Sequence, residues 1–283
     1  MITKFYPQMK IVNLLVSILL LPATLMAQGT TPGVHSLPVA LQPKVQFLNP
    51  EYLVYAPRGT SYDKLPLLIF LHGAGGVGQD IQQIKATPSK IWDSIEKFGK
   101  GPCLVVAPQC LKVGQGERGI WTAEDLNILL HHLKATLPVD DRRIYLSGIS
   151  MGGYGTWAWA AHDPQHFAAI APIVGGIGRE GPKAVTPDFD QWAASLAKVP
   201  VYAFVGALDT TVPPDRSERM IAAIRKAGGK QAKLKIYPDQ GHGAGRVVVA
   251  DADYYEWIFA QQRDASPQPE VSTAGPGTTP SKL

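Results

Sequence analysis

Short apolar runs alternate with stretches of helical periodicity along most of the chain. Several of these runs are hydrophobic at nearly every position, which is typical of strands that helices cover on both faces. Their alternation with helices predicts one α/β domain over residues 45–263, with a mostly parallel central sheet and helices on both faces. The expected strands are Glu51–Ala56, Leu67–Leu71, Leu104–Ala107, Ile144–Leu146, Ala168–Val174, Val201–Val205 and Leu234–Tyr237.

Helical periodicity is clear in three further segments. Thr122 and Asp125 have the spacing of a capping box, and the leucines that follow lie on one helical face. A second helix is expected over Asp215–Ala227, before a Gly-Gly pair that stops it. The last helix has an apolar stripe formed by Tyr254, Trp257 and Ile258.

The two ends of the chain read differently from the middle. Residues 1–27 contain two lysines, an apolar stretch over residues 11–21 and a small-residue cleavage pattern, which predicts a secretory signal peptide. A membrane anchor is the alternative, but the stretch is shorter than the roughly 18 apolar residues that a span needs. We therefore expect a secreted or periplasmic protein without a stable membrane span, translated from Met1 or from Met9.

Two flanking segments lack any apolar period. Residues 28–44 contain three prolines and predict a linker that leads into the domain. Residues 264–283 are rich in Pro, Ser, Thr and Gly and predict a disordered tail.

Composition excludes several classes of protein. With 45% hydrophobic and 18% charged residues in 283 positions, the chain can bury a sizeable core. The formal charge is +4 and falls to +2 without the first 27 residues, which carry Lys4 and Lys10 and no acid. So mild a charge predicts no binding to nucleic acid or to an anionic membrane. Nothing in the composition fixes an oligomeric state.

The cysteines and histidines give no signal of a metal site. Cys103 and Cys110 bracket an expected strand and would lie too far apart for a disulfide, so we expect two free, mostly buried thiols. The sequence contains no CxxC pair and no HExxH helix, and we expect no metal.

A nucleophile motif lies in the middle of the domain. Gly148-Ile149-Ser150-Met151-Gly152 matches G-x-S-x-G, between an expected strand over Arg143–Ser147 and an expected helix over Met151–Ala161. The motif requires this strand–turn–helix setting, because the serine sits on a strained turn and the glycines let strand and helix approach. Ser150 is therefore the candidate nucleophile.

A serine nucleophile needs a base, and the base needs an acid to orient it. In this fold the chain order is serine, acid, histidine. Asp209 and His242 each lie just past the end of an expected strand, where open α/β sheets place their sites. Asp215 and Asp239 are the alternative acids, but Asp215 is expected to begin a helix and Asp239 is only three residues from the histidine. His242 is the only histidine after the acid.

Backbone amides are the candidate oxyanion donors. The strand Leu67–Leu71 is followed by His72-Gly73-Ala74-Gly75-Gly76, in the position of the loop that supplies one donor in this fold. We expect the amides of Met151 and Ala74 to form the oxyanion hole, with Gly73 as the alternative to Ala74. His72 is expected to order this loop rather than to transfer protons.

Two glycine patterns also match a dinucleotide fingerprint. They begin at Gly73 and Gly176, but the first lacks an acid at the end of a following strand and the second meets Pro182 where a helix should begin. We therefore expect no cofactor.

Several segments together resemble a known group of enzymes. They are Glu51–Pro57, Leu71–Gly76, Val106–Cys110, Asp141–Trp157 and Gly241-His242. They are similar to secreted α/β-hydrolases labelled predicted peptidases or phospholipase/carboxylesterase-like proteins, relatives of the polyhydroxybutyrate depolymerase and feruloyl esterase group. The resemblance implies an α/β-hydrolase fold and a serine hydrolase without metal or cofactor.

The segment that often carries a lid in this fold is short here. Only residues 175–199 separate the expected strands Ala168–Val174 and Val201–Val205, so we expect no large lid and an open cleft for small-molecule or polymer-borne esters. Trp121 and Tyr154 are the candidate substrate-binding residues, with Trp192 as a further wall. Trp157 is expected to pack in the core.

The sequence thus predicts a secreted serine esterase that acts through Ser150, His242 and Asp209. A serine peptidase with the same machinery is the first alternative. A non-catalytic carbohydrate-binding or scaffolding module on this fold is the second.

Overall fold

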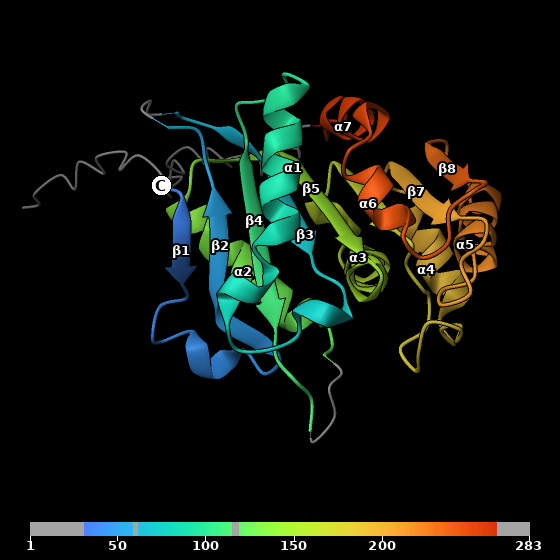
Figure 1. Cartoon of the computed structure of the whole chain (residues 1–283), viewed down its shortest axis with the longest axis horizontal. Helices are drawn as coiled ribbons and strands as arrows, with labels where there is room; N and C mark the ends of the chain where they lie inside the picture. The colour runs from blue at the N-terminus through green and yellow to red at the C-terminus, as the bar shows by residue number, and fades with distance from the viewer. Residues whose placement is uncertain (1–30, 59–61, 115–118, 265–283) are drawn as a thin grey trace, which may run out of the picture.

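An eight-stranded sheet forms the centre of the molecule (Figure 1). The computed structural model describes residues 31–58, 62–114 and 119–264. The strand order is β1-β2-β4-β3-β5-β6-β7-β8, with β2 antiparallel to both of its neighbours and all other pairs parallel. The strands are β1 (Gly33–Ser36), β2 (Leu48–Tyr55), β3 (Leu65–Leu71), β4 (Leu104–Cys110), β5 (Val139–Ile149), β6 (Ala169–Ile173), β7 (Val201–Gly206) and β8 (Ala232–Tyr237).

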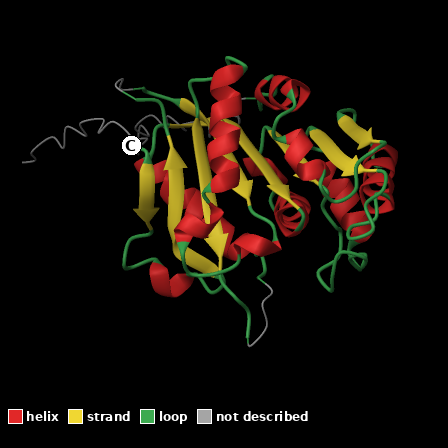
Figure 2. Cartoon of the chain, viewed as in Figure 1, coloured by secondary structure: helices red, strands yellow, loops and turns green. Residues whose placement is uncertain are grey.

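Helices cover both faces of the sheet (Figures 1 and 2). On one face α1 (Ala86–Lys97), α6 (Ala244–Val248) and α7 (Ala252–Phe259) share a core with the sheet. On the other face lie α2 (Ala123–Thr136), α3 (Met151–His162), α4 (Phe189–Leu196) and α5 (Asp215–Lys226). Strands β3, β4, β6 and β7 are buried at every position, because each is covered from both sides. The predicted fold class is confirmed.

Short helices and connections complete the domain. Among the residues that the structure describes, four segments form 3₁₀ helices, at Gln42–Lys44, Ala74–Gly76, Ile81–Ile84 and Pro164–His166. The segment between β6 and β7 holds α4 as its only regular helix in the described residues, so no large lid covers the sheet. Cys103 and Cys110 are both buried free thiols, as predicted. Within the described residues no helix is long and apolar enough to cross a membrane.

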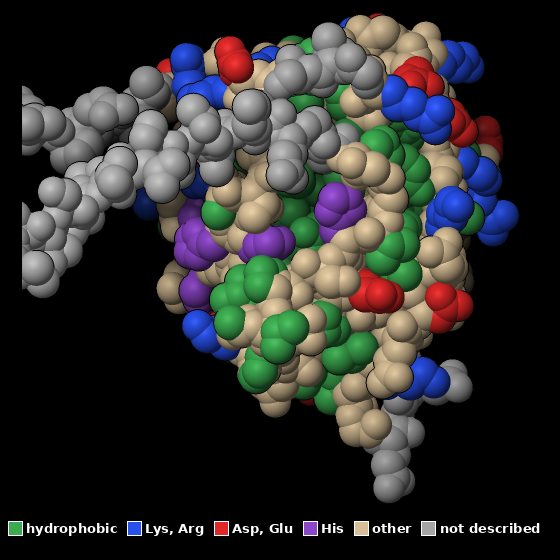
Figure 3. All heavy atoms as spheres, turned by 90° about the vertical axis from the view of Figure 1, so that its left-hand side faces the viewer, with side chains coloured by type: hydrophobic (Ala, Val, Ile, Leu, Met, Phe, Trp, Pro, Cys, Tyr) green, Lys and Arg blue, Asp and Glu red, His purple; other side chains and the backbone are tan. Residues whose placement is uncertain are grey.

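The predicted linker over residues 28–44 is wrong from Gly33 onward. Residues 33–36 form β1, which pairs with β2 from Gly33↔Val54 to Ser36↔Glu51, and Leu37 is 2% exposed. Backbone hydrogen bonds to a sheet edge hold this strand, and four residues are too few to show an apolar period. Figure 3 shows several histidine side chains beside hydrophobic ones on this side of the molecule.

Residues 1–30 and 265–283 lie outside the described residues, so the signal peptide and the tail remain predictions.

The start of α2 differs from a capping box in one respect. The amide of Asp125 donates to Thr122 Oγ1 at 3.4 Å, as expected of a cap. The carboxylate of Asp125 does not close the box but accepts from the amides of Gln46 and Phe47, at 3.0 and 2.7 Å. Asp125 is only 4% exposed, so these two bonds hold a buried charge and fasten the chain before β2 to α2.

This anchor predicts a stability effect. Asp125→Ala should lower the free energy of unfolding by about 3 kcal/mol, because two backbone amides lose a charged, buried partner. Chemical denaturation of the purified protein measures the change. Glu124→Ala is the matched control, an exposed acid in the same helical turn, and should change stability by less than about 0.5 kcal/mol. Equal losses in the two variants would contradict this role of Asp125.

Candidate active site

Ser150 lies on the turn between β5 and α3 in a conformation that few residues adopt. Its backbone has φ 59° and ψ −113°, and its amide donates to the carbonyl of Ile173 at 2.9 Å. A methyl group added at Gly152 would lie 2.0 Å from the carbonyl oxygen of Leu71, and one at Gly148 would lie 2.4 Å from that of Gly152. Both positions therefore require glycine, because the first turn of α3 lies against the end of β3.

The side chains of Ser150, His242 and Asp209 form a hydrogen-bonded chain. His242 Nε2 is 2.9 Å from Ser150 Oγ, and His242 Nδ1 is 2.8 Å from Asp209 Oδ2. An ionised carboxylate only accepts hydrogen bonds, so it favours the tautomer with the proton on Nδ1. Nε2 then has a free lone pair toward the serine hydroxyl, and the arrangement can remove a proton from Ser150.

The acid and the base are held by backbone contacts between neighbouring loops. The amide of Leu208 donates to the carbonyl of Gln240 at 2.9 Å, which joins the loop after β7 to the loop after β8. A methyl group at Gly206 would lie 2.3 Å from the carbonyl oxygen of Gly241, so this close approach also depends on glycine. The two loops therefore bring Asp209 to His242.

Asp209 is oriented by two amides that the sequence analysis missed. Its Oδ1 accepts from the amides of Thr211 and Val212, each at 2.9 Å, which leaves Oδ2 for His242. The side chain of Asp209 is fully buried, whereas that of His242 is 32% exposed. The signal was present in the sequence, since Asp commonly accepts from amides two and three residues later in a turn. The alternative acid Asp215 begins α5, as expected, and pairs with Arg216.

The predicted oxyanion donors lie beside Ser150. A methyl group at Gly73 would be 3.5 Å from Ser150 Cβ, so this loop borders the nucleophile. Within the described residues the amides of Gly73, Ala74 and Met151 have no hydrogen-bond acceptor. Met151 is the first residue of α3, where the helix dipole favours negative charge. These amides are free to stabilise an oxyanion.

His72 lies beneath this loop and away from the hydrogen-bonded chain. Its Nε2 accepts from the amide of Cys110 at 3.0 Å, so the proton must be on Nδ1, which is 2.6 Å from the carbonyl oxygen of Gly73. Burial lowers the pKa of His72 to about 4. His72 is therefore neutral at ordinary pH and holds the loop to the end of β4.

A cavity of about 290 Å³ begins one helical turn after Ser150. Trp121 and Tyr154, both predicted to bind substrate, line it together with Trp192. Trp121 is only 4% exposed, and its indole N–H donates to the carbonyl of His72 at 3.3 Å. Trp157 is fully buried in the core, as expected. Polar residues that no motif had indicated also line the cavity, among them Glu124, His162, Arg179, Asp188 and Gln191.

No metal site accompanies these residues in the part of the chain that the structure describes. There, no three His, Cys, Asp or Glu side chains are grouped so that they could hold a metal ion.

Proteins that match this sequence include relatives named as carboxymethylenebutenolidases and feruloyl esterases. The profile of the Dienelactone hydrolase family matches residues 118–249, a range that includes Ser150, Asp209 and His242. A Salmonella typhimurium protein assigned as a carboxymethylenebutenolidase is 36% identical over 106 residues, covering 36% of this chain and 37% of that protein. Feruloyl esterase C of Emericella nidulans is 26% identical over 150 residues, covering 53% of this chain and 55% of the relative. The matches therefore span about half or less of these relatives.

Solved structures with a similar fold include an esterase. The crystal structure of a thermostable esterase aligns with a TM-score of 0.63 at 25% identity, covering 75% of this chain and 59% of that one. The predicted resemblance to the α/β-hydrolase esterase group is thus confirmed.

The buried, neutral His72 predicts a pH dependence of stability. Its pKa is about 4 in the folded protein and 6.5 in an unfolded chain, so between these values the unfolded chain binds a proton that the folded one does not. Acidification from pH 6.5 to 4 should therefore lower the free energy of unfolding, by on the order of 3 kcal/mol from this residue.

Denaturation across this pH range measures the slope. His72→Gln should be less stable at neutral pH, because it loses buried hydrogen bonds, but its stability should depend less steeply on pH. The difference between the two slopes isolates His72 from other titrating groups. Parallel slopes in the wild type and the variant would refute the assignment.

Proposed function

We propose that this α/β-hydrolase, similar to dienelactone hydrolases and feruloyl esterases, is a secreted serine hydrolase that cleaves carboxylic esters through an acyl-enzyme. The observation that carries the proposal is the hydrogen-bonded chain from Ser150 Oγ through His242 to the buried carboxylate of Asp209. The names of the matched relatives support an ester as the substrate.

The first half of the reaction forms the acyl-enzyme. Ser150 Oγ attacks the ester carbonyl carbon while His242 Nε2 takes the hydroxyl proton, and Asp209 stabilises the imidazolium that forms. The amides of Met151 and Ala74, or of Gly73 in place of Ala74, hold the negative oxygen of the tetrahedral intermediate. When the intermediate collapses, the bond to the alcohol breaks and His242 returns the proton to the leaving oxygen.

The second half releases the acid. Water attacks the acyl group on Ser150 and gives its proton to His242, and collapse of the second intermediate restores the serine hydroxyl. No metal or cofactor is needed for either half.

The cavity beside Tyr154 supports an aromatic or otherwise flat acyl or alcohol group. The rings of Tyr154 and Trp192 have centroids 6.1 Å apart, and the cavity that they line begins one turn from the nucleophile. Aromatic walls bind flat apolar groups with little loss of side-chain freedom. We therefore place the variable part of a small-molecule or polymer-borne ester here.

The central prediction concerns Ser150. Ser150→Ala should lower kcat for a short p-nitrophenyl ester by at least about 10⁴-fold, because the acyl-enzyme cannot form. Ser195→Ala, a partly exposed serine of α4, is the control and should retain wild-type rates. A fluorophosphonate probe should label the wild type and the Ser195 variant but not Ser150→Ala. Wild-type hydrolysis by Ser150→Ala would end the proposal.

A substrate panel separates the remaining alternatives. Acetyl, feruloyl and hydroxyalkanoate esters are compared with aminoacyl peptides, and we expect higher kcat/KM for the esters. A preference for the peptides would favour the serine peptidase. A native protein that neither hydrolyses any substrate nor reacts with the fluorophosphonate would favour a non-catalytic module.

Secretion is a separate part of the proposal. When the full chain is expressed in a bacterial host, we expect the protein in the periplasm or the medium, with Gln28 as the first residue of the mature form. Cell fractionation and N-terminal sequencing measure both. An unprocessed chain that stays with the membrane would favour an anchor instead.

A further inference from the structure

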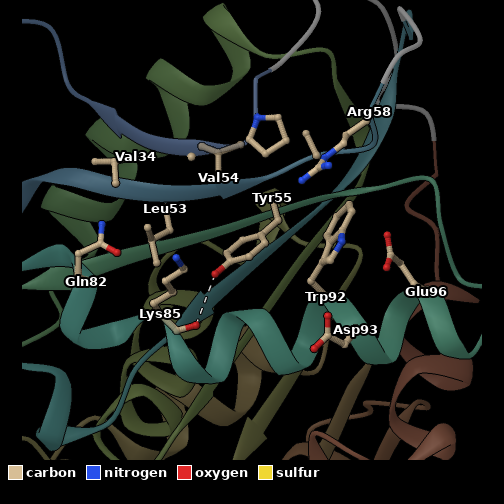
Figure 4. Close-up of a pocket in the computed structure, with 13 residues that line it drawn as sticks. Val34, Leu53, Val54, Tyr55, Arg58, Gln82, Lys85, Trp92, Asp93 and Glu96 are labelled. Atoms are coloured by element: carbon tan, nitrogen blue, oxygen red, sulfur yellow. Dashed lines mark hydrogen bonds between the residues drawn. The ribbon is translucent and has the colours of Figure 1, made fainter.

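A second, larger hollow lies away from the triad, between α1 and the strands at the edge of the sheet (Figure 4). Its volume is about 770 Å³, and its lining comes from β1, β2, α1 and the 3₁₀ helix Ile81–Ile84. We call it the α1 groove. None of the proposed catalytic or oxyanion residues lines it, so it is a site distinct from the candidate active site.

Two aromatic rings lie side by side in the α1 groove. The rings of Tyr55 on β2 and Trp92 on α1 have centroids 6.1 Å apart and planes within 28° of each other. The hydroxyl of Tyr55 is fixed by Ser89 Oγ at 2.9 Å. Both aromatic side chains are only partly buried, so part of each ring is open to a ligand.

Four charged side chains surround these rings. Arg58, Lys85, Asp93 and Glu96 line the groove, and within the described residues none of the four forms an ion pair. Figure 4 shows Arg58 near Trp92, Glu96 at one end and Lys85 below Tyr55. Two positive and two negative charges cancel, so the groove offers both donors and acceptors with no net charge.

The aromatic rings and the balanced charges of the α1 groove together favour one class of ligand over the others. A wholly apolar ligand would remove water from four charged groups without replacing their hydrogen bonds. A phosphate or other anion would meet as many negative as positive side chains. A carbohydrate fits both features, because the C–H face of a sugar ring packs on an aromatic face and its hydroxyls donate to carboxylates and accept from Arg and Lys.

We infer that the α1 groove binds a neutral oligosaccharide chain, with sugar rings on Tyr55 and Trp92. The volume is within the range of about 300–1,000 Å³ that is usual for ligand sites. The groove lies against side chains on one face of the sheet, so recognition is by side chains rather than by pairing with a strand edge.

One end of the α1 groove lies close to the loop after β3, which carries the candidate oxyanion donors. Gln82 lines one end of the groove, and the side-chain amide of the next residue, Gln83, donates to the carbonyl of Gly75 at 3.2 Å. Gly75 belongs to the loop that carries the oxyanion candidates Gly73 and Ala74. A sugar chain held in the groove would therefore start near this loop, which suits an ester carried on a polysaccharide.

The test measures binding in full-length Ser150→Ala, so that turnover cannot interfere and the result does not depend on the proposed chemistry. Xylohexaose and cellohexaose are titrated by calorimetry, with an uncharged hexapeptide as the competing ligand class. We expect one of the two sugars to bind and Trp92→Ala to weaken that binding by about tenfold or more. Trp92→Phe should recover part of it, because it keeps an aromatic face.

Two further variants make the result independent of the folding of Trp92→Ala. Glu96→Ala removes an exposed acceptor that lines the groove, and should weaken binding by about threefold to tenfold. Lys97→Ala changes the next residue of α1, which is exposed but does not line the groove, and should leave affinity within about twofold.

The same groove substitutions are also made in the protein that keeps Ser150. Its hydrolysis of a short p-nitrophenyl ester is the independent readout, and the substitutions should not change it. The inference is overturned if neither sugar binds at about 10 mM, if the groove variants bind as well as Lys97→Ala, or if the peptide binds in place of the sugars.

Discussion

The contact between the first turn of α3 and the end of β3 is the constraint on which the site depends. Added methyl groups at Gly148 and Gly152 would lie 2.4 and 2.0 Å from backbone carbonyl oxygens, so no side chain fits at either position. The tight turn forces Ser150 to φ 59° and holds its hydroxyl at the start of a helix. Packing against the buried sheet stabilises a conformation that an isolated chain would rarely adopt.

The remaining parts of the site are built onto this turn by backbone hydrogen bonds. The loops after β7 and β8 are joined to each other, and the loop after β3 is fixed by His72. Asp209 is a buried charge that accepts from two amides and faces one imidazole, which compensates for the loss of water around it. These side chains and the free amides therefore hold a fixed geometry, which is what the proposed ester cleavage requires of them.

The two hollows proposed to bind ligands lie on opposite faces of the sheet. The cavity at Tyr154 is lined by α3 from Tyr154 onward, whereas the α1 groove lies on the opposite face, along α1. The two hollows differ in their lining, because α3 presents aromatic walls beside polar groups and α1 presents balanced charges around two rings. A protein with both could hold the carrier of an ester in one place and the reacting group in another.

The sequence by itself determined the fold class, seven of the strands and the residues of the hydrogen-bonded chain, because these depend on local patterns. Continuous apolar runs identify buried strands, and glycines around Ser150 identify a turn too tight for side chains. Tertiary structure alone decided the rest. β1 exists because its backbone pairs with β2, Asp125 holds residues 46 and 47 instead of closing a capping box, and the α1 groove joins residues more than 30 positions apart. Each of these features is a contact between segments distant in the chain, and such contacts leave no period or motif in a single sequence.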